Sequence, residues 1–218
     1  MNALIQISLM ALLASSIRLC ATAGQWIQVG AIAAISIPLW LLLDGLWQTP
    51  WLFTTLEPAL LAALQVGILL GYTRFGLKFA RQAIATFLLA GAAIAAAATT
   101  WGSPNTYGIE ETFNAGIPIL IAAIATVSIY QVLASSSPAR PSWAAMAIAL
   151  ASGLAIDSFL YVALSSAIPL WQSAAWVKPL GLKLADKLVL AIGIAVPIVA
   201  IEMSSLVDIF QDLQPRDR

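Results

Sequence analysis

The chain has 218 residues, of which 61% are hydrophobic and 9% are charged, and its ten basic and ten acidic residues leave no formal net charge. The mean hydropathy of +0.93 is higher than a water-soluble core of this length requires, so the composition predicts an integral membrane protein. Histidine is absent and Cys20 is the single cysteine, which argues against disulfides, Cys/His zinc sites and Ser-His-Asp or Cys-His catalysis.

Apolar windows near the length needed to cross about 30 Å of hydrocarbon follow one another along the chain. The first has no basic region before it and is read as a transmembrane helix, not a cleaved signal, although it is short and polar at its end. A hairpin lying shallowly in the membrane is an alternative for the first two windows. The windows lie at roughly 3–20, 26–43, 52–72, 82–100, 114–134, 143–167 and 179–205.

These windows predict an all-α integral membrane protein, a bundle of six to seven transmembrane helices. The loops between them are short, and none has the composition of a separate soluble domain. We therefore expect a single transmembrane domain over residues 1–207, followed by a short solvated cytoplasmic tail over residues 208–218.

The orientation follows from basic residues in the short loops. If the spans alternate, all of these residues fall on one side, whereas the opposite loops at 44–51 and 101–113 carry none. The basic side is predicted to be cytoplasmic, in a prokaryotic inner membrane, with the N-terminus outside and the C-terminus inside. The basic residues concerned are Arg18, Arg74, Lys78, Arg81, Arg140, Arg216 and Arg218.

Asp157 lies inside an otherwise apolar stretch that runs from Trp143 to about Leu170. An ionised carboxylate in hydrocarbon is costly unless it is paired or faces a wet cavity, so the position predicts a functional site. Lys187 is the best available partner, because a rise of about 1.5 Å per residue places the two at similar depth. The alternative is a static ion pair that locks two helices together.

Other polar side chains accompany Asp157 at helical spacing, including a hydroxyl and an aromatic ring on the same stripe. A carboxylate beside an aromatic ring suits a flat heterocycle with adjacent N–H donors, because both oxygens can accept in parallel while the ring stacks. Two lysines share a face of the last span, and a glutamine lies in the middle of the third. The predicted substrate-binding residues are Asp157, Ser158, Tyr161, Lys187, Lys183 and Gln65.

Short motifs resemble the VUT family of queuosine-precursor transporters. Phe75-Gly76 followed by Ala80-Arg81 resembles the family's aromatic-Gly-x-x-x-Ala-Arg signature in a basic cytoplasmic loop. Asp157-Ser158 resembles its Asp-Ser/Thr helix, and Lys187 with a proline ten residues later resembles the Lys and Pro of its last helix. The order and separations also fit, over roughly residues 61–206.

The resemblance implies a small membrane carrier that imports 7-cyano- or 7-aminomethyl-7-deazaguanine or a related base. It implies a fold similar to the substrate-binding components of vitamin importers. In that reading Asp157 binds the guanine-like edge, Tyr161 stacks on the ring, and Lys187 holds Asp157 ionised between cycles. The chain has no nucleotide-binding loop, so transport would need ion coupling or a partner ATPase.

Two other classes of function stay open. One is a ligand-free membrane scaffold or assembly subunit. The other is a seven-helix receptor or photoreceptor, for which a lysine in the last helix is suitable but Lys187 is off-centre and aromatic residues are sparse in the third and sixth spans. An enzyme is not expected, because one buried acid without a second acid or nucleophile supports no obvious reaction. We expect no cofactor, metal site or nucleic-acid partner. We expect the lipid bilayer to surround the protein.

Overall fold

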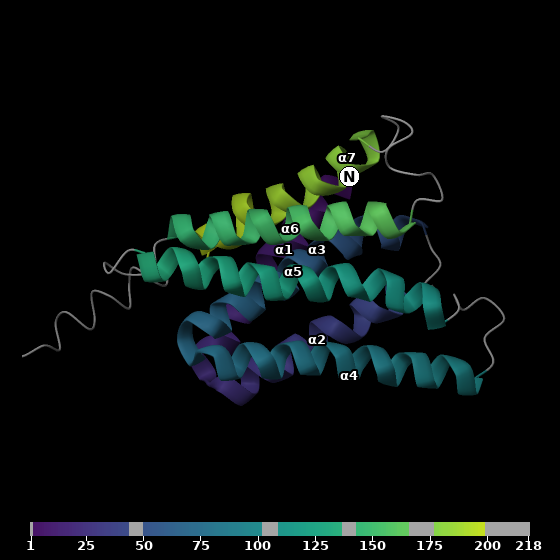
Figure 1. The fold of residues 1–218 in the computed structure, drawn as a ribbon, viewed down its shortest axis with the longest axis horizontal. Coiled ribbons are helices and arrows are strands. Elements are labelled where there is room, and N and C mark those ends of the chain that lie inside the picture. Colours follow the sequence, from purple (N-terminus) through teal and green to yellow (C-terminus); the bar gives the residue numbers. More distant parts are fainter. Residues whose placement is uncertain (1, 44–49, 102–108, 137–142, 166–176, 199–218) are drawn as a thin grey trace, which may run out of the picture.

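The computed structural model describes residues 2–43, 50–101, 109–136, 143–165 and 177–198. All of these residues are helical except Gly24 and Gly76, and the helices run along the long axis of the molecule (Figure 1). The helices are α1 (Asn2–Ala23), α2 (Gln25–Leu43), α3 (Pro50–Phe75), α4 (Leu77–Trp101), α5 (Ile109–Ser136), α6 (Trp143–Ser165), α7 (Val177–Leu188) and the π-helical η2 (Val189–Ala195).

The prediction of a helical membrane bundle is confirmed in outline. Six helices, α1 to α6, are long and apolar enough to cross a membrane. The length of α1 and α2 favours two crossings over a shallow hairpin. The predicted seventh span, 179–205, begins as the charged helix α7 and is described only as far as residue 198, so its full crossing stays a prediction. The predicted tail, 208–218, lies outside the described residues.

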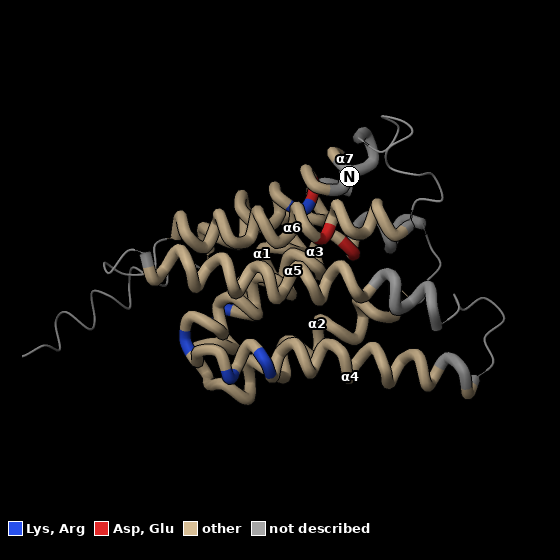
Figure 2. Tube along the Cα trace, viewed as in Figure 1, with Lys and Arg blue, Asp and Glu red and all other residues tan. Residues whose placement is uncertain are grey.

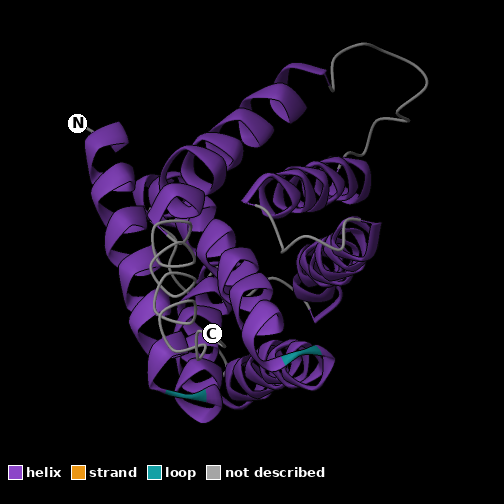
Figure 3. Cartoon of the chain, turned by 90° about the vertical axis from the view of Figure 1, so that its left-hand side faces the viewer, coloured by secondary structure: helices purple, strands orange, loops and turns teal. Residues whose placement is uncertain are grey.

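At each of two helix junctions, a single glycine reverses the direction of the chain. Gly76 has φ 76°, and its N–H donates to the carbonyl of Tyr72 at 2.8 Å, which ends α3 with a left-handed residue. The carbonyl of Gly76 then accepts from the N–H groups of Phe79 and Ala80, which begins α4. Gly24, with φ 138°, joins α1 to α2 in a similar way. Both turns lie at the same end of the bundle (Figure 3).

Basic residues gather at this end, which we call the basic end (Figure 2). Arg18 lies near the end of α1, Arg74 near the end of α3, and Lys78 and Arg81 in the first turns of α4. The guanidinium of Arg74 donates to the carbonyl of Ala21 at 3.0 Å, which ties the ends of α3 and α1 together. The expected gathering of these four cations is therefore confirmed. Their cytoplasmic location stays a prediction.

Helix α3 is the centre of the bundle. Of its span, 83% lies buried, against 44% or less in the other five candidate spans, and every residue from 57 to 71 is buried. It packs against all the other helices, from α1 to η2. Polar side chains on α3 are therefore shielded from lipid and face neighbouring helices.

Trp40 holds α2, α4 and α5 together. Its indole N–H donates to the carbonyl of Phe87 at 2.8 Å, and its ring stacks on the Phe87 ring with centroids 5.0 Å apart. A Cβ added at Gly91 or Gly116 would lie only 2.4 or 2.2 Å from the indole ring. Both glycines are needed because a larger residue would occupy the space that the ring fills.

This packing predicts that Gly116→Ala destabilises the protein. The added methyl group would overlap the Trp40 ring, which a hydrogen bond and Gly91 hold in place, so we expect a loss of about 1–3 kcal/mol. The matched control is Gly30→Ala on α2, where an added Cβ meets nothing within 4 Å. Thermal unfolding of the purified protein in detergent measures both. Equal stability of the two variants would show that the Trp40 ring can move away from the added methyl group.

Candidate functional site

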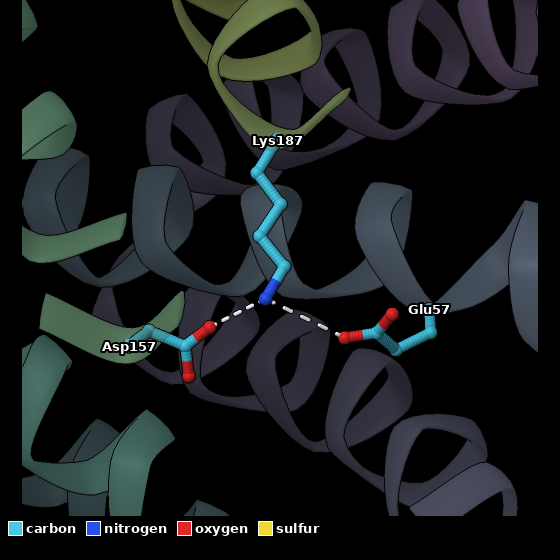
Figure 4. Close-up of polar contacts among 3 residues, drawn as sticks. All are labelled: Glu57, Asp157 and Lys187. Carbon is cyan, nitrogen blue, oxygen red and sulfur yellow. Dashed lines mark hydrogen bonds and ion pairs between the residues drawn. The ribbon is translucent and has the colours of Figure 1, made fainter. Parts of the chain in front are cut away.

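Three charged side chains meet inside the bundle, and we call them the Lys187 triad (Figure 4). The Lys187 ammonium donates a hydrogen bond to Asp157 Oδ2 at 2.5 Å and lies 3.6 Å from Glu57 Oε1. The side chains of Lys187, Asp157 and Glu57 are 1%, 2% and 7% exposed. The ammonium therefore lies between two carboxylates, and the three side chains have almost no accessible surface.

The triad joins three helices at one depth. Glu57 comes from α3, Asp157 from α6 and Lys187 from α7. At a rise of about 1.5 Å per residue, they lie about 10, 12 and 15 Å from the ends of their helices opposite the basic end. These helices cross the bundle in different directions, so the side chains meet although the residues are far apart in the chain.

The charges of the triad do not balance. Two carboxylates face one ammonium, and a buried charge is tolerated only when it is paired and hydrogen-bonded. The contact with Asp157 is a hydrogen bond, whereas the separation from Glu57 is an ion-pair distance beyond hydrogen-bonding range. Lys187 therefore neutralises Asp157 well and Glu57 less well.

The predicted pairing of Asp157 with Lys187 is confirmed. The expectation that no second acid lies near Asp157 is wrong, because Glu57 approaches the same ammonium from α3. The sequence held the signal, since Glu57 is the only charged residue between 51 and 73. The reasoning that singled out an acid in the apolar run of α6 applies equally to Glu57.

Ser158 and Gln65 are fully buried, but neither contacts the triad through a described hydrogen bond. The Thr126 hydroxyl lies 3.0 Å from Gln65 Oε1 and donates to the carbonyl of Ala122 at 2.8 Å. Thr126 also packs against Gly153, one turn before Asp157 on α6, where an added Cβ would lie on the Thr126 hydroxyl. Gln65 lies two turns beyond Glu57 on α3, about 12 Å closer to the basic end.

Two hydrogen-bonding atoms in this region find no partner among the described residues. They are the Ser158 hydroxyl and the side-chain nitrogen of Gln65, both fully enclosed. A buried polar atom without a partner costs about 1–3 kcal/mol. The interior of the bundle can therefore satisfy a further polar group at each of these two places.

The remaining predicted residues are less closely associated with the triad. Tyr161 lies one turn beyond Asp157 on α6 and is partly buried. The backbone of Lys183 belongs to α7, but its side chain lies outside the described part of the structure. The structure brings together Asp157 and Lys187, and it leaves the roles of Tyr161 and Lys183 as predictions.

A wide helical turn follows Lys187 directly. Residues 189–195 form η2, and the N–H of Val196 bonds to the carbonyl of Ala191, five residues earlier. Pro197 has no N–H and its ring would crowd the carbonyl of residue 193 in a regular α-helix, so the wider turn accommodates it. The last helix is therefore irregular next to the triad lysine.

The described cavity lies elsewhere, between α2, α4 and α5. It has a volume of about 170 Å³ and only apolar or glycine lining, so it offers no polar recognition. The triad itself is closed in this conformation. The cavity is lined by Trp40, Leu88, Gly91, Ala92, Ala95, Gly116, Ile117 and Leu120.

No protein-family model matches the chain, and neither a curated protein nor a solved structure is significantly similar. The resemblance to the VUT family therefore rests on the short motifs alone.

The triad geometry predicts unequal effects of removing its members. Lys187→Met removes the ammonium that lies between two buried carboxylates, so we expect a loss of about 3–5 kcal/mol and little folded protein. Glu57→Gln keeps the hydrogen bond between Lys187 and Asp157, so its effect should be much smaller. Size-exclusion chromatography and thermal unfolding in detergent measure both variants. If the two variants lose stability equally, Glu57 is as tightly paired as Asp157.

Proposed function

We propose that the protein is a membrane transporter that imports a small planar heterocycle. The observation that carries the proposal is the Lys187 ammonium placed between two buried carboxylates from different helices. Ionisable groups at this depth of a helical membrane protein are costly, and they occur where substrates or ions are moved. Lys187 has a second carboxylate within reach, so Asp157 can exchange its partner without leaving the lysine unpaired.

The proposed binding step is a change of partner at Asp157. A substrate with adjacent N–H donors bonds to both carboxylate oxygens and displaces the Lys187 ammonium. The ammonium then moves toward Glu57, from which it is 3.6 Å away in the closed conformation. Because the lysine keeps a negative partner throughout, the cost of opening the pair is partly offset.

Two buried polar atoms on α6 and α3 support a polar solute over an apolar one. The Ser158 hydroxyl and the Gln65 side-chain nitrogen are enclosed and lack partners among the residues described. Hydrocarbon cannot satisfy them, whereas a heterocycle or an accompanying water can. Tyr161, one turn from Asp157, is the proposed stacking residue.

The proposed substrate is a queuosine precursor of the 7-deazaguanine type. Its guanine-like edge carries adjacent donors that match a carboxylate, and the short motifs shared with the VUT family supply the same candidate. An analogue without the exocyclic amino group should bind markedly worse, because one Asp157 oxygen would be desolvated without a partner. We further propose a prokaryotic inner membrane as the location, with the basic end in the cytoplasm.

A static scaffold is the main alternative, and the closed triad favours it to some degree. Over the whole residue, Asp157 and Lys187 are each 1% exposed, as expected of a pair that only locks helices. A locking pair makes Asp157→Asn and Lys187→Met equally unstable, with stability restored when both are combined. A transporter instead retains folded protein in Asp157→Asn and loses uptake.

A photoreceptor is a second alternative because a lysine with carboxylates beside it resembles a Schiff base with its counter-ions. The aromatic pairs Trp40–Phe87, Tyr72–Tyr130 and Phe75–Phe79 lie on other helices than α7, and the described cavity lies between α2, α4 and α5. We expect added retinal to leave the visible absorbance of the purified protein unchanged. A new visible band that Lys187→Arg abolishes would favour the photoreceptor.

Uptake tests the substrate directly. Cells that cannot make deazapurines but carry this protein should regain queuosine-modified tRNA when fed the precursor, as measured by mass spectrometry of digested tRNA. Asp157→Asn should abolish this recovery because the amide cannot accept two parallel hydrogen bonds. Asp186→Asn is the matched control, since Asp186 is an exposed carboxylate beside Lys187.

The control should support recovery at the rate of the unchanged protein. Failure of the unchanged protein at saturating precursor, with correct membrane insertion, would reject the queuosine assignment.

A further inference from the structure

The cavity between α2, α4 and α5 is lined by residues other than those of the Lys187 triad. Its volume is about 170 Å³, and its lining consists of apolar side chains and two glycines. We propose that it binds one acyl chain of a membrane lipid, which enters between α4 and α5. The proposal requires that the protein is inserted in a membrane, and it is independent of the proposed transport of a heterocycle.

The lining of the cavity favours hydrocarbon over water. The indole N–H of Trp40 already donates to the carbonyl of Phe87 at 2.8 Å, so the lining that the structure describes offers no free hydrogen-bonding side chain. Water needs about two to four polar partners to occupy a cavity, whereas an apolar cavity of about 150 Å³ stays dry and takes up apolar molecules. The cavity is therefore suited to an alkyl group.

The cavity reaches the surface of the bundle between α4 and α5. Leu88 of α4 and Ile117 of α5 both line it, although they are 41% and 38% exposed. Their neighbours Leu89 and Ile121 are 70% and 41% exposed, so apolar surface continues beyond the opening. On membrane-spanning helices, apolar surface of this kind lies against lipid tails. Acyl chains are therefore the molecules that meet the opening.

The opening lies within the depth of the hydrocarbon. At a rise of about 1.5 Å per residue, Gly91 lies about 21 Å along α4 from the basic end, and Gly116 lies about 10 Å along α5 from the other end. The hydrocarbon core of a membrane is about 30 Å thick, so both glycines lie inside it. The lining of α4, from Leu88 to Ala95, extends about 10 Å along the axis that α4 and α5 share (Figure 1). A chain from the leaflet opposite the basic end can therefore lie along it.

The Trp40 ring is held in place and does not fill the remaining space. A Cβ added at Gly91 or Gly116 would lie 2.4 or 2.2 Å from the indole, so the ring packs directly against both backbones. These contacts and the hydrogen bond to Phe87 fix its position. The atoms that line an empty space lose dispersion contacts on one side, and an acyl chain restores them.

The volume suits part of a long molecule better than a whole ligand. Pockets that enclose most of a complete organic ligand measure about 300–1,000 Å³. This cavity is smaller and reaches the surface, so the molecule that fills it extends beyond it. An acyl chain meets this condition, since its remainder and its headgroup stay in the bilayer. A side chain from a second copy of the protein would meet it only if a helix of that copy lay against α4 and α5.

Photolabelling of the full chain tests for a bound acyl chain. The protein is reconstituted in phosphatidylcholine vesicles in which a small fraction of the lipid carries a diazirine in the middle of one acyl chain. After irradiation, peptide mass spectrometry locates the label. Trp40 is 4% exposed and lines the cavity, so a chain reaches its side chain from inside the cavity.

We expect label at Trp40 and at the exposed Leu89. The buried Phe79 does not line the cavity and should show only background. Label at Leu89 with no more than background at Trp40 would overturn the proposal, since lipid would then contact the surface of α4 without entering the cavity.

A larger side chain in the cavity should exclude the lipid chain. Ala95 lines the cavity, so in Ala95→Leu we expect the Trp40 label to fall to the background found at Phe79. The label at Leu89 should not change. Ala93→Leu is the matched control, because Ala93 is exposed on the same helix and does not line the cavity. The control should keep the Trp40 label.

Ala92→Leu is a second filling variant at another lining position. Size-exclusion chromatography shows which filling variants are folded. Trp40 label that persists in a folded filling variant would show that chains reach Trp40 without occupying the cavity, and would overturn the proposal. If neither variant folds, the comparison of Trp40 with Phe79 in the unchanged protein decides.

Dilution of the protein in the vesicles distinguishes lipid from a second copy. We expect the Trp40 label per protein to be the same at low and high ratios of protein to lipid, because acyl chains are in excess at both. Label that is lost as the protein is concentrated would show that a second copy occupies the opening, and would overturn the proposal.

Discussion

One ammonium group neutralises carboxyl groups from two other helices, and the arrangement of α3, α6 and α7 depends on it. Lys187 is hydrogen-bonded to Asp157 and lies at ion-pair distance from Glu57, and all three are buried. Separating any of these helices would expose a charge to hydrocarbon or leave one without a partner. The triad therefore specifies which helices are neighbours, and at what depth, more strictly than apolar packing does.

Apolar packing provides the frame in which this meeting is possible. Helix α3 is buried along most of its length, so Glu57 and Gln65 are directed toward other helices and not toward lipid. On the opposite side of the bundle, Gly91 and Gly116 leave room for the Trp40 ring. Lipid offers no hydrophobic force between helices, so close fit of this kind and internal hydrogen bonds are what hold them together.

The number of carboxylates around Lys187 distinguishes a static role of the triad from a dynamic one. A lysine with a single carboxylate partner is a lock, since losing the partner leaves a bare charge. A lysine between two carboxylates at unequal distances has a second negative partner toward which it can move. An element with two discrete states is what a transport cycle requires, because a ligand can then bias one state against the other. The unpaired atoms of Ser158 and Gln65 add places where a polar ligand would contribute.

The sequence by itself determined the class of protein and most of its helices. A span must be long and apolar whatever its neighbours are, so the predicted windows at 26–43 and 143–167 agree closely with α2 and α6. The pairing of Asp157 with Lys187 was also predictable, because helix rise alone places two rare charges at one depth.

Only the tertiary structure decided how helices distant in the chain pack together. The approach of Glu57 to Lys187, the contact of Gln65 with Thr126 and the seating of Trp40 between two glycines depend on helix rotation and distance. Hydropathy carries no information on either quantity, since each face of a membrane helix is apolar whether it meets lipid or protein. Glu57 was therefore visible in the sequence as a charge in an apolar run, whereas its contact with Lys187 was not.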